Sequence, residues 1–365
     1  MSGTETRYCI RIVIIGEKGV GKTCLLRRLL GKSIEDVEST DGVDVVHGCE
    51  IRLSDGQWII DKGPTEMDTI SRIKTRITTR LEQMFIEKSE FLVNCRIWDF
   101  SGSRCFYPTH QIFLSPSALH LLVADITKDV KKMNTEGGYD NIGDYVNFWF
   151  NSIHSYSKNT KDSTGEHLNP PVIVVCTGID KCKEDLSERK IEFEKQLTSV
   201  LDNEVKKPHL RRICYVSNTL PLDEDFDNLR ESIFLEYGKN IETFGERLPL
   251  SWILLQQTLD IVRAAGVNIL PWSDMVDFAS EFSIKNQNEV SLYLKYHHEI
   301  GNIIYFESLN DHIILNPKWL ADALKCFLPD KYDKDVKLTE EWKTIEETGE
   351  LKPSLIIKLT TRTKT

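Results

Sequence analysis

The sequence predicts an α/β fold in two parts: a mostly parallel sheet wound with helices, then a smaller, mainly helical α+β domain with a winged-helix-like order. Up to about residue 240, short apolar runs alternate with amphipathic stretches, the pattern of strands joined by crossover helices. After that point, three amphipathic stretches follow one another before two short apolar runs. We therefore expect domains at 1–245 and 246–328, with 329–365 as a partial or truncated continuation of the second.

The first domain contains five apolar runs that we expect to form strands. They are residues 8–15, 91–100, 118–127, 170–178 and 211–218. The last three have near-continuous apolar cores, as strands buried on both faces do. Apolar residues recur at helical spacing in 141–156, 189–205 and 226–237, which predicts helices between the strands. The charged, threonine-rich residues 61–90 interrupt this alternation and indicate an exposed helix inserted in a hairpin.

The second domain is expected to contain three successive helices, a hairpin and a fourth helix. The helices lie at 248–266, 273–282 and 288–301, where Gly266 and Gly301 are typical stop signals. The hairpin pairs 303–306 with 313–316, and Pro317 is suited to the first position of the fourth helix.

A glycine-rich segment after the first strand has the spacing of a phosphate-binding loop. The run GEKGVGKTC contains Gly16, Glu17, Lys18, Gly19, Val20, Gly21, Lys22, Thr23 and Cys24. Its glycines allow several backbone N–H groups to point at a phosphate, and the following helix adds its positive dipole end. Lys22 would reach the β- and γ-phosphates, and the Thr23 hydroxyl would ligate Mg²⁺. The alternative is an ordinary glycine turn, which the strand before it and the helix after it disfavour.

Two further residues are candidates for the metal and the γ-phosphate. Asp99 ends a strand in WDFSG, from which a carboxylate would approach Mg²⁺ through water while the Gly102 N–H meets the γ-phosphate. Thr40 lies between the first helix and the second strand, where its hydroxyl would complete the Mg²⁺ shell only while the γ-phosphate is present. An exposed loop threonine is the alternative interpretation of Thr40.

The choice between guanine and adenine depends on Asp180, which follows the strand VIVVCTG. A guanine edge presents two N–H donors that one carboxylate can accept, whereas adenine presents an acceptor at the same place. Each charge-assisted hydrogen bond is worth roughly 1.5–3 kcal/mol, enough to select GTP over ATP. Ser217 ends the last strand, where a tight turn can aim a backbone N–H at the guanine oxygen.

The order GEKGVGKT, Thr40, WDFSG, TGID and VSN resembles the Ras-like GTPases, and the run from WDFSG to LLVADIT resembles the Roc subclass. LPLSW, EIGNIIYF and ILNPKWLADAL resemble the N-terminal half of the COR domain that follows Roc in Roco proteins. The resemblance implies a signalling protein that binds GTP or GDP with Mg²⁺ and forms a homodimer through COR. It places Thr177, Asp180, Lys181, Ser217 and Asn218 at the guanine base.

Several residues depart from the pattern of efficient Ras-like enzymes. Ser103 stands where a glutamine usually orients the attacking water, and Gly178 gives no side chain to cover the base. We therefore expect weak nucleotide affinity and slow turnover. Arg104 is a candidate arginine finger or a solvated loop residue, and His110 either replaces the missing glutamine or packs in its helix.

Charge and composition exclude some classes of binding partner. The net charge of −10 opposes a main role in binding nucleic acid or anionic membranes. Residues 247–328 carry six basic and nine acidic side chains, so protein contact is a better use of the winged-helix-like region than DNA. Nine cysteines without a C-x-x-C pair are typical of reduced, buried thiols. Neither terminus has a lipidation or signal pattern, so we expect a cytoplasmic protein without a direct membrane anchor.

Three functions remain open at this point. The first is a Roc GTPase that hydrolyses GTP slowly and signals through COR to other signalling proteins. In the second, the chain binds GTP but serves as a dimerisation scaffold without useful turnover. In the third, it is a STAND-like signalling ATPase with a winged helix, in which Asp125 would act as the acidic residue of the second nucleotide motif.

Overall fold

The computed structural model describes residues 3–60, 92–130, 142–157, 161, 165–201, 205–220, 223–241, 244–325, 339–350 and 352–355. The insertion expected at 61–90 lies outside the described residues, as do 326–338 and 356–365 of the C-terminal part.

The first domain is built on a seven-stranded sheet with the order β4-β3-β5-β2-β6-β7-β8 among the described residues. The strands are β2 (Cys9–Gly16), β3 (Val43–Arg52), β4 (Trp58–Ile60), β5 (Leu92–Phe100), β6 (Leu119–Asp125), β7 (Val172–Thr177) and β8 (Leu210–Tyr215). β3 runs antiparallel to β4 and β5, and all other neighbours are parallel. The predicted, mostly parallel α/β sheet is therefore confirmed.

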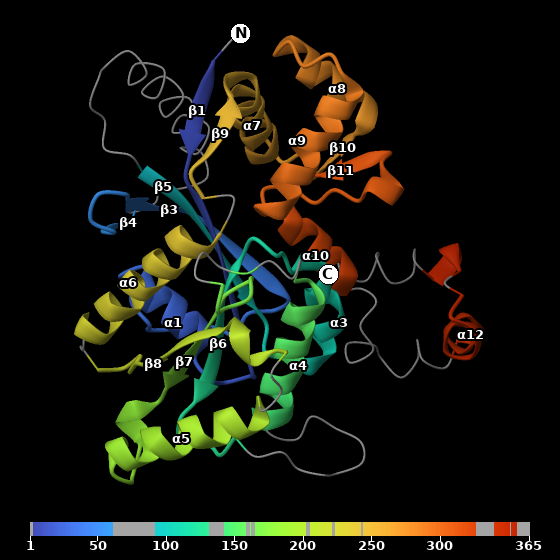
Figure 1. The fold of residues 1–365 in the computed structure, drawn as a ribbon. Coiled ribbons are helices and arrows are strands. Elements are labelled where there is room, and N and C mark those ends of the chain that lie inside the picture. The colour runs from blue at the N-terminus through green and yellow to red at the C-terminus, as the bar shows by residue number, and fades with distance from the viewer. Residues whose placement is uncertain are drawn as a thin grey trace.

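Helices cover both faces of this sheet (Figure 1). They are α1 (Lys22–Leu29), α4 (Ile142–Ser155), α5 (Leu186–Val200) and α6 (Asp223–Asn240). Apolar residues of α4 and α5, such as Trp149 and Phe193, join the core on one face, and those of α1 and α6, such as Leu25 and Leu229, join the core on the other. A short helix α3 (Tyr107–His110) lies between two 3₁₀ turns, Arg104–Phe106 and Gln111–Phe113.

The second domain has its own core and a winged-helix-like order. Its elements are α7 (Leu250–Ala264), β10 (Ile269–Pro271), α8 (Trp272–Glu281), α9 (Gln287–Glu299), β11 (His312–Ile314), α10 (Pro317–Lys325) and α12 (Glu340–Thr348). Of the expected hairpin, an isolated bridge joins Ile304 to Ile314. The main partner of β11 is instead β10, which the sequence analysis missed because it is a three-residue strand between two helices.

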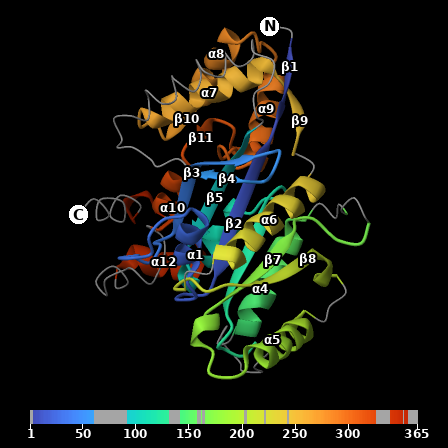
Figure 2. The same ribbon diagram turned by 90° about the vertical axis from the view of Figure 1, so that its left-hand side faces the viewer.

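A second small sheet and a buried arginine connect the two domains. β1 (Thr4–Arg7) pairs antiparallel with β9 (Glu246–Pro249), as Figure 2 shows. The Arg11 guanidinium stacks 4.4 Å from the centre of the Trp98 ring and donates to the carbonyl oxygens of Phe113 (2.5 Å) and Glu299 (3.4 Å). Burial lowers the pKa of Arg11 to about 9. Because Glu299 belongs to α9, this contact fixes α9 against the sheet domain.

The described residues include no helix that is both long enough and apolar enough to cross a lipid bilayer. The eight cysteines in the described part of the chain are all free thiols.

Candidate nucleotide-binding site

The glycine-rich loop joins the buried end of β2 to the first turn of α1. Gly19 and Gly21 have φ angles of 83° and 85°, a left-handed conformation that glycine adopts without strain. A Cβ at Gly16 would lie 2.7 Å from the Val123 carbonyl oxygen, so only glycine fits between β2 and β6. The glycines therefore allow the chain to turn sharply and present the N-terminus of α1 at the edge of the sheet.

Three oxygen-bearing side chains meet beside this loop. The Thr23 and Thr40 hydroxyls each donate to Asp99 Oδ2 at 2.7 Å, and the two hydroxyl oxygens are 2.9 Å apart. Asp99 is completely buried, and burial raises the pKa of its carboxyl, although the two hydroxyls and Lys22 act in the opposite direction. Its other oxygen, Oδ1, is buried and has no hydrogen bond in the described residues. Two hydroxyls and a carboxylate with an unsatisfied oxygen fit Mg²⁺, which prefers hard oxygen ligands.

Lys22 points back into the loop. Its Nζ donates to the Glu17 carbonyl oxygen at 2.9 Å, and only 6% of the residue is exposed. Burial lowers its pKa to about 8, although Asp99 and Glu17 attract the charged form. The ammonium is thus held by a neutral acceptor, which an anionic oxygen can replace with a stronger, charge-assisted bond.

A cavity of about 520 Å³ opens in front of these groups. Its walls come from the glycine-rich loop, from residues 37–41 and from residues 101–103, 105 and 106. The predicted site residues that line it are Lys18, Gly19, Gly21, Lys22, Thr23, Cys24, Thr40, Gly102 and Ser103. A Cβ at Gly102 would lie 2.5 Å from Lys22 Nζ, so this glycine allows the closest approach between the two walls. The Ser103 hydroxyl lies 3.2 Å from Cys105 Sγ.

The residues predicted to contact the base form a separate cluster that does not line this cavity. Asp180 accepts hydrogen bonds from Ser217 Oγ (2.7 Å) and Thr219 Oγ1 (2.9 Å). Burial acts to raise the pKa of Asp180, but these two hydroxyl bonds outweigh it and hold the pKa below its usual value. Thr219 was missed by the sequence analysis, although a hydroxyl two residues after Ser217 is visible in VSNT. Asp180 and the neighbouring Lys181 are both exposed.

Two side chains tie this cluster to the glycine-rich loop. The buried Thr177 hydroxyl donates to the Val20 carbonyl oxygen at 2.7 Å, and Asn218 Nδ2 donates to the Gly21 carbonyl oxygen at 3.1 Å. Both carbonyl oxygens belong to the loop. The ends of β7 and β8 therefore fix the loop in position as well as presenting Asp180.

His110 is packed in the interior of the sheet domain. It is fully buried, its ring centre lies 4.6 Å from that of Phe100, and its Nε2 is 3.2 Å from the Gly42 carbonyl oxygen. Burial lowers its pKa to about 3, so the ring stays neutral at physiological pH. This geometry favours the packing interpretation of His110. Arg104 is exposed at the start of the neighbouring 3₁₀ turn.

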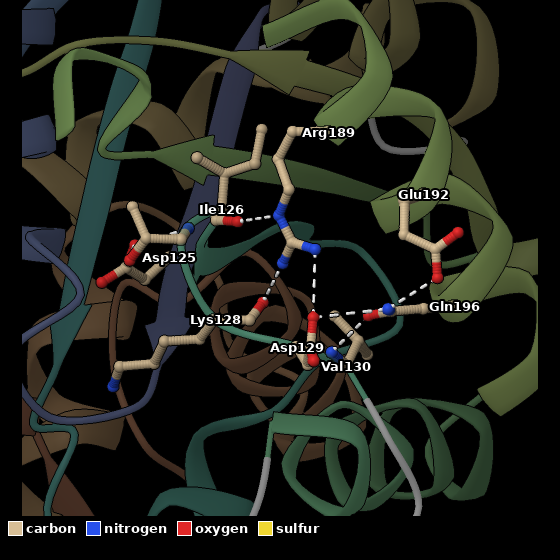
Figure 3. Close-up of polar contacts among 9 residues, drawn as sticks. Asp125, Ile126, Lys128, Asp129, Val130, Arg189, Glu192 and Gln196 are labelled. Atoms are coloured by element: carbon tan, nitrogen blue, oxygen red, sulfur yellow. Dashed lines mark hydrogen bonds and ion pairs between the residues drawn. The ribbon is translucent and has the colours of Figure 1, made fainter. Parts of the chain in front are cut away.

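Figure 3 shows a buried arginine of α5 that holds the loop following β6. Arg189 donates to the carbonyl oxygens of Ile126 (2.7 Å) and Lys128 (2.6 Å) and to Asp129 Oδ1 (3.0 Å). The loop brings Lys128 Nζ to 3.5 Å from Glu17 Oε2 in the glycine-rich loop. The Arg189 contacts could not be expected from the sequence, because Arg189 lies about sixty positions from its partners.

Asp125, the acidic residue required by the ATPase hypothesis, is the last residue of β6, directly before this loop. Its Oδ1 accepts hydrogen bonds from the backbone N–H (3.0 Å) and hydroxyl (2.7 Å) of Thr127. Asp125 does not line the cavity, and the carboxylate beside Thr23 is that of Asp99. The geometry therefore gives no support to Asp125 as a metal-binding acid.

The segment that follows Thr40 contacts α10 of the second domain. Lys325 Nζ lies 3.6 Å from Asp41 Oδ2, and Lys318 Nζ lies 3.0 Å from Asp44 Oδ1. A Cβ on Gly42 would collide with the Lys325 side chain. Since Asp41 also lines the cavity, one short segment contacts both the cavity and the second domain.

Comparison with known proteins gives a consistent assignment. Residues 249–348 match the family model described as the C-terminal of Roc, COR-A domain. The chain is 24% identical over 376 residues to the probable serine/threonine-protein kinase pats1 of Dictyostelium discoideum, covering 98% of this chain and 10% of that protein. It is 22% identical over 347 residues to cyclic GMP-binding protein C of the same organism, covering 90% of this chain and 11% of that protein. The chain thus spans about a tenth of the length of these curated relatives.

A solved structure has a similar fold. It is that of Methanosarcina barkeri Roco2 RocCORdC bound to GDP, with 17% sequence identity, a TM-score of 0.61, and coverage of 100% of this chain and 93% of that one. A COR-A match directly behind a Ras-like sheet, in a chain that aligns with the kinase pats1 over nearly all its length, supports a Roc-COR assignment for this chain.

Proposed function

We propose that this chain binds GTP and GDP with Mg²⁺, hydrolyses GTP slowly, and passes its nucleotide state to the COR region. The observation that carries the proposal is the convergence of Thr23, Thr40 and Asp99 beside a glycine-rich loop that opens into a cavity. Thr23, Thr40 and Asp99 would hold Mg²⁺, directly or through water. Bound Mg²⁺ would neutralise phosphate charge and orient the terminal phosphoryl group.

The residues of the chain have separable tasks in this proposal. The loop N–H groups and Lys22 bind the phosphates, and the Gly102 N–H meets the terminal phosphate. Lys22 gives up the Glu17 carbonyl oxygen for a phosphate oxygen, which raises its pKa from about 8. Thr40 would report whether a terminal phosphate is present, because its hydroxyl completes the Mg²⁺ shell only while that phosphate is bound. Its position beside Thr23 and Asp99 is suited to this role.

Guanine selectivity is assigned to Asp180. Ser217 donates to one oxygen of its carboxylate and Thr219 to the other, and its pKa below the usual range keeps it ionised at neutral pH. An ionised carboxylate accepts both guanine N–H donors and repels the adenine acceptor. The GDP bound to the related Methanosarcina barkeri Roco2 structure supports the same choice of base.

Slow turnover is expected because Ser103 has a short side chain whose hydroxyl is engaged by Cys105 Sγ at 3.2 Å. Ser103 therefore orients an attacking water poorly compared with a glutamine at that place. This same observation favours the second candidate function, a GTP-bound dimerisation scaffold without turnover. Single-turnover hydrolysis of bound GTP separates the two, since a scaffold would release no phosphate beyond the rate in buffer alone.

The signalling part of the proposal concerns the second domain. We propose that the 40–44 segment transmits the state of the nucleotide to α10, and that the COR region forms a homodimer and contacts other signalling proteins in the cytoplasm. The contacts of Asp41 and Asp44 with Lys325 and Lys318 support the first step. Neither nucleic acid nor a membrane anchor is part of the proposal, as the net charge of −10 favours neither.

Calorimetric titration with GDP, GTPγS and an ATP analogue in magnesium buffer tests the nucleotide assignment. The wild-type protein should bind both guanine nucleotides and bind the ATP analogue at least ~100-fold more weakly. Asp180→Asn should remove most of that preference, whereas Asp277→Asn, an exposed aspartate of α8, should leave it unchanged. Equal or tighter binding of the ATP analogue by the wild-type protein would contradict the proposal.

A further inference from the structure

The third residue of the glycine-rich loop, Lys18, has no role in the contacts described so far. It is exposed and lines the cavity together with Thr40, Gly102 and Ser103. Its backbone nitrogen lies where a Cβ on Gly102 would collide, so this part of the loop is closely packed against the opposite wall. The backbone of Lys18 is therefore held where the two walls of the cavity meet, and the residue is exposed there.

The charges around Lys18 are mostly matched to other partners. Glu17 faces Lys128 at 3.5 Å, and Asp41 faces Lys325 at 3.6 Å. Lys22 is bound to the Glu17 carbonyl oxygen. In the described part of the chain, the Lys18 ammonium has neither a hydrogen bond nor an ion pair. It is thus a cation at the cavity wall whose acceptor is not supplied by the described residues.

A nucleoside triphosphate carries more negative charge than one Mg²⁺ and one lysine neutralise. During phosphoryl transfer, the excess lies on the oxygens of the terminal phosphate, and a second side-chain cation there accelerates the reaction greatly in enzymes that recruit one. Since Ser103 has a short side chain that orients an attacking water poorly, charge stabilisation is the stronger contribution that the described residues can make.

We propose that Lys18 is a second cation for the terminal phosphate, supplied by the chain itself, and that it distinguishes the triphosphate from the diphosphate. The inference rests on the proposed function. Lys22 contacts both nucleotides, whereas Lys18, at the junction with Gly102 and Ser103, contacts only the group that the diphosphate lacks.

The test compares Lys18→Met, Lys18→Arg and the control Lys195→Met, which removes an exposed lysine from α5. Affinities for GTPγS and GDP are measured by calorimetry, and bound GTP is followed through a single turnover. Lys18→Met should weaken GTPγS about 10- to 100-fold, change GDP less than about 3-fold, and slow hydrolysis by at least about 10-fold. Lys18→Arg should retain the preference for GTPγS, and Lys195→Met should behave as the wild type.

Several results would overturn the inference. Equal weakening of GTPγS and GDP by Lys18→Met would show a general effect on the loop. Unchanged or faster hydrolysis would show that the side chain contributes nothing to the transition state or obstructs it. Either result overturns the role of Lys18 alone, because guanine nucleotide still binds. A wild-type protein that binds no guanine nucleotide overturns the proposed function, and this inference with it.

Discussion

Replacing Thr177 by valine should loosen the glycine-rich loop while leaving the choice of base unchanged. Valine keeps the shape of threonine and suits a strand end, so the only group lost is the hydroxyl that donates to the Val20 carbonyl oxygen at 2.7 Å and to the Ala124 carbonyl oxygen at 3.3 Å. Thr177 is only 4% exposed, so water cannot readily replace the lost donor. A buried acceptor without a partner costs about 1–3 kcal/mol, and we expect the free energy of unfolding to fall by that amount.

Urea unfolding of the nucleotide-free protein measures this loss, and calorimetry with GDP measures how much of it appears in binding. Thr177→Ser keeps the hydroxyl and should retain most of the stability that Thr177→Val loses. Because Asp180 is untouched, the ratio of GDP to ADP affinity should stay at the wild-type value in both variants. If valine and serine destabilise equally, the hydroxyl does not hold the loop. A changed base preference would mean that Thr177 acts on the base and not on the loop.

Three further predictions concern the loop and its supports. Phosphate contact should raise the pKa of Lys22 from about 8, so binding of GDP should take up a proton. The affinity for GDP should therefore fall as the pH rises above 8, and calorimetry in buffers of different ionisation enthalpy measures the proton uptake. Gly102→Ala places a Cβ 2.5 Å from Lys22 Nζ and should cost about 1–3 kcal/mol of binding to GTPγS, measured against wild type. Arg189→Ala removes three hydrogen bonds and should lower the free energy of unfolding by about 2–4 kcal/mol in urea, whereas the exposed Lys195→Ala should have little effect.

The fold was predictable where hydrophobic patterning decides it. Strands buried on both faces have continuous apolar runs, so β6 and β7 were evident, and the three helices of the second domain followed from their apolar spacing and stop signals. Short strands were not predictable. β10 has three residues and is defined by its partner β11, more than forty positions away, and β1 is defined by β9 in the same manner.

In the site too, features set by residues near in sequence were predictable, and those set by tertiary contacts were not. The phosphate loop was predictable because its geometry depends on glycines within one short segment, and Thr23, Thr40 and Asp99 were each expected beside Mg²⁺ from their places after a strand or in a loop. The attachments of the loop depend on tertiary contacts. Thr177 was expected at the base, and its hydroxyl bond to the loop was not foreseen; the contacts of Arg189 come from α5. Thr177 and Arg189 both donate to backbone carbonyl oxygens, and every residue has one, so the sequence cannot indicate which carbonyl is used.

The proposed coupling to the second domain must rely on packing more than on charge. The ion pair between Lys318 and Asp44 joins side chains that are 46% and 54% exposed, and pairs of this kind contribute about 0–1 kcal/mol and weaken in salt. Beneath it, Ala321 and Val43 belong to the same buried core, with Leu324 packed against it. Full burial of a leucine contributes about 1.5–3 kcal/mol, and Leu324 is partly buried, so it gains part of this. Together with the buried Val43 and Ala321, this packing should contribute more than the exposed ion pair, so a shift of residues 40–44 that breaks it should change the free energy more. Leu324→Ala should therefore alter the response of the second domain to GTPγS more than Lys318→Gln does, and raising the salt concentration should leave most of that response intact.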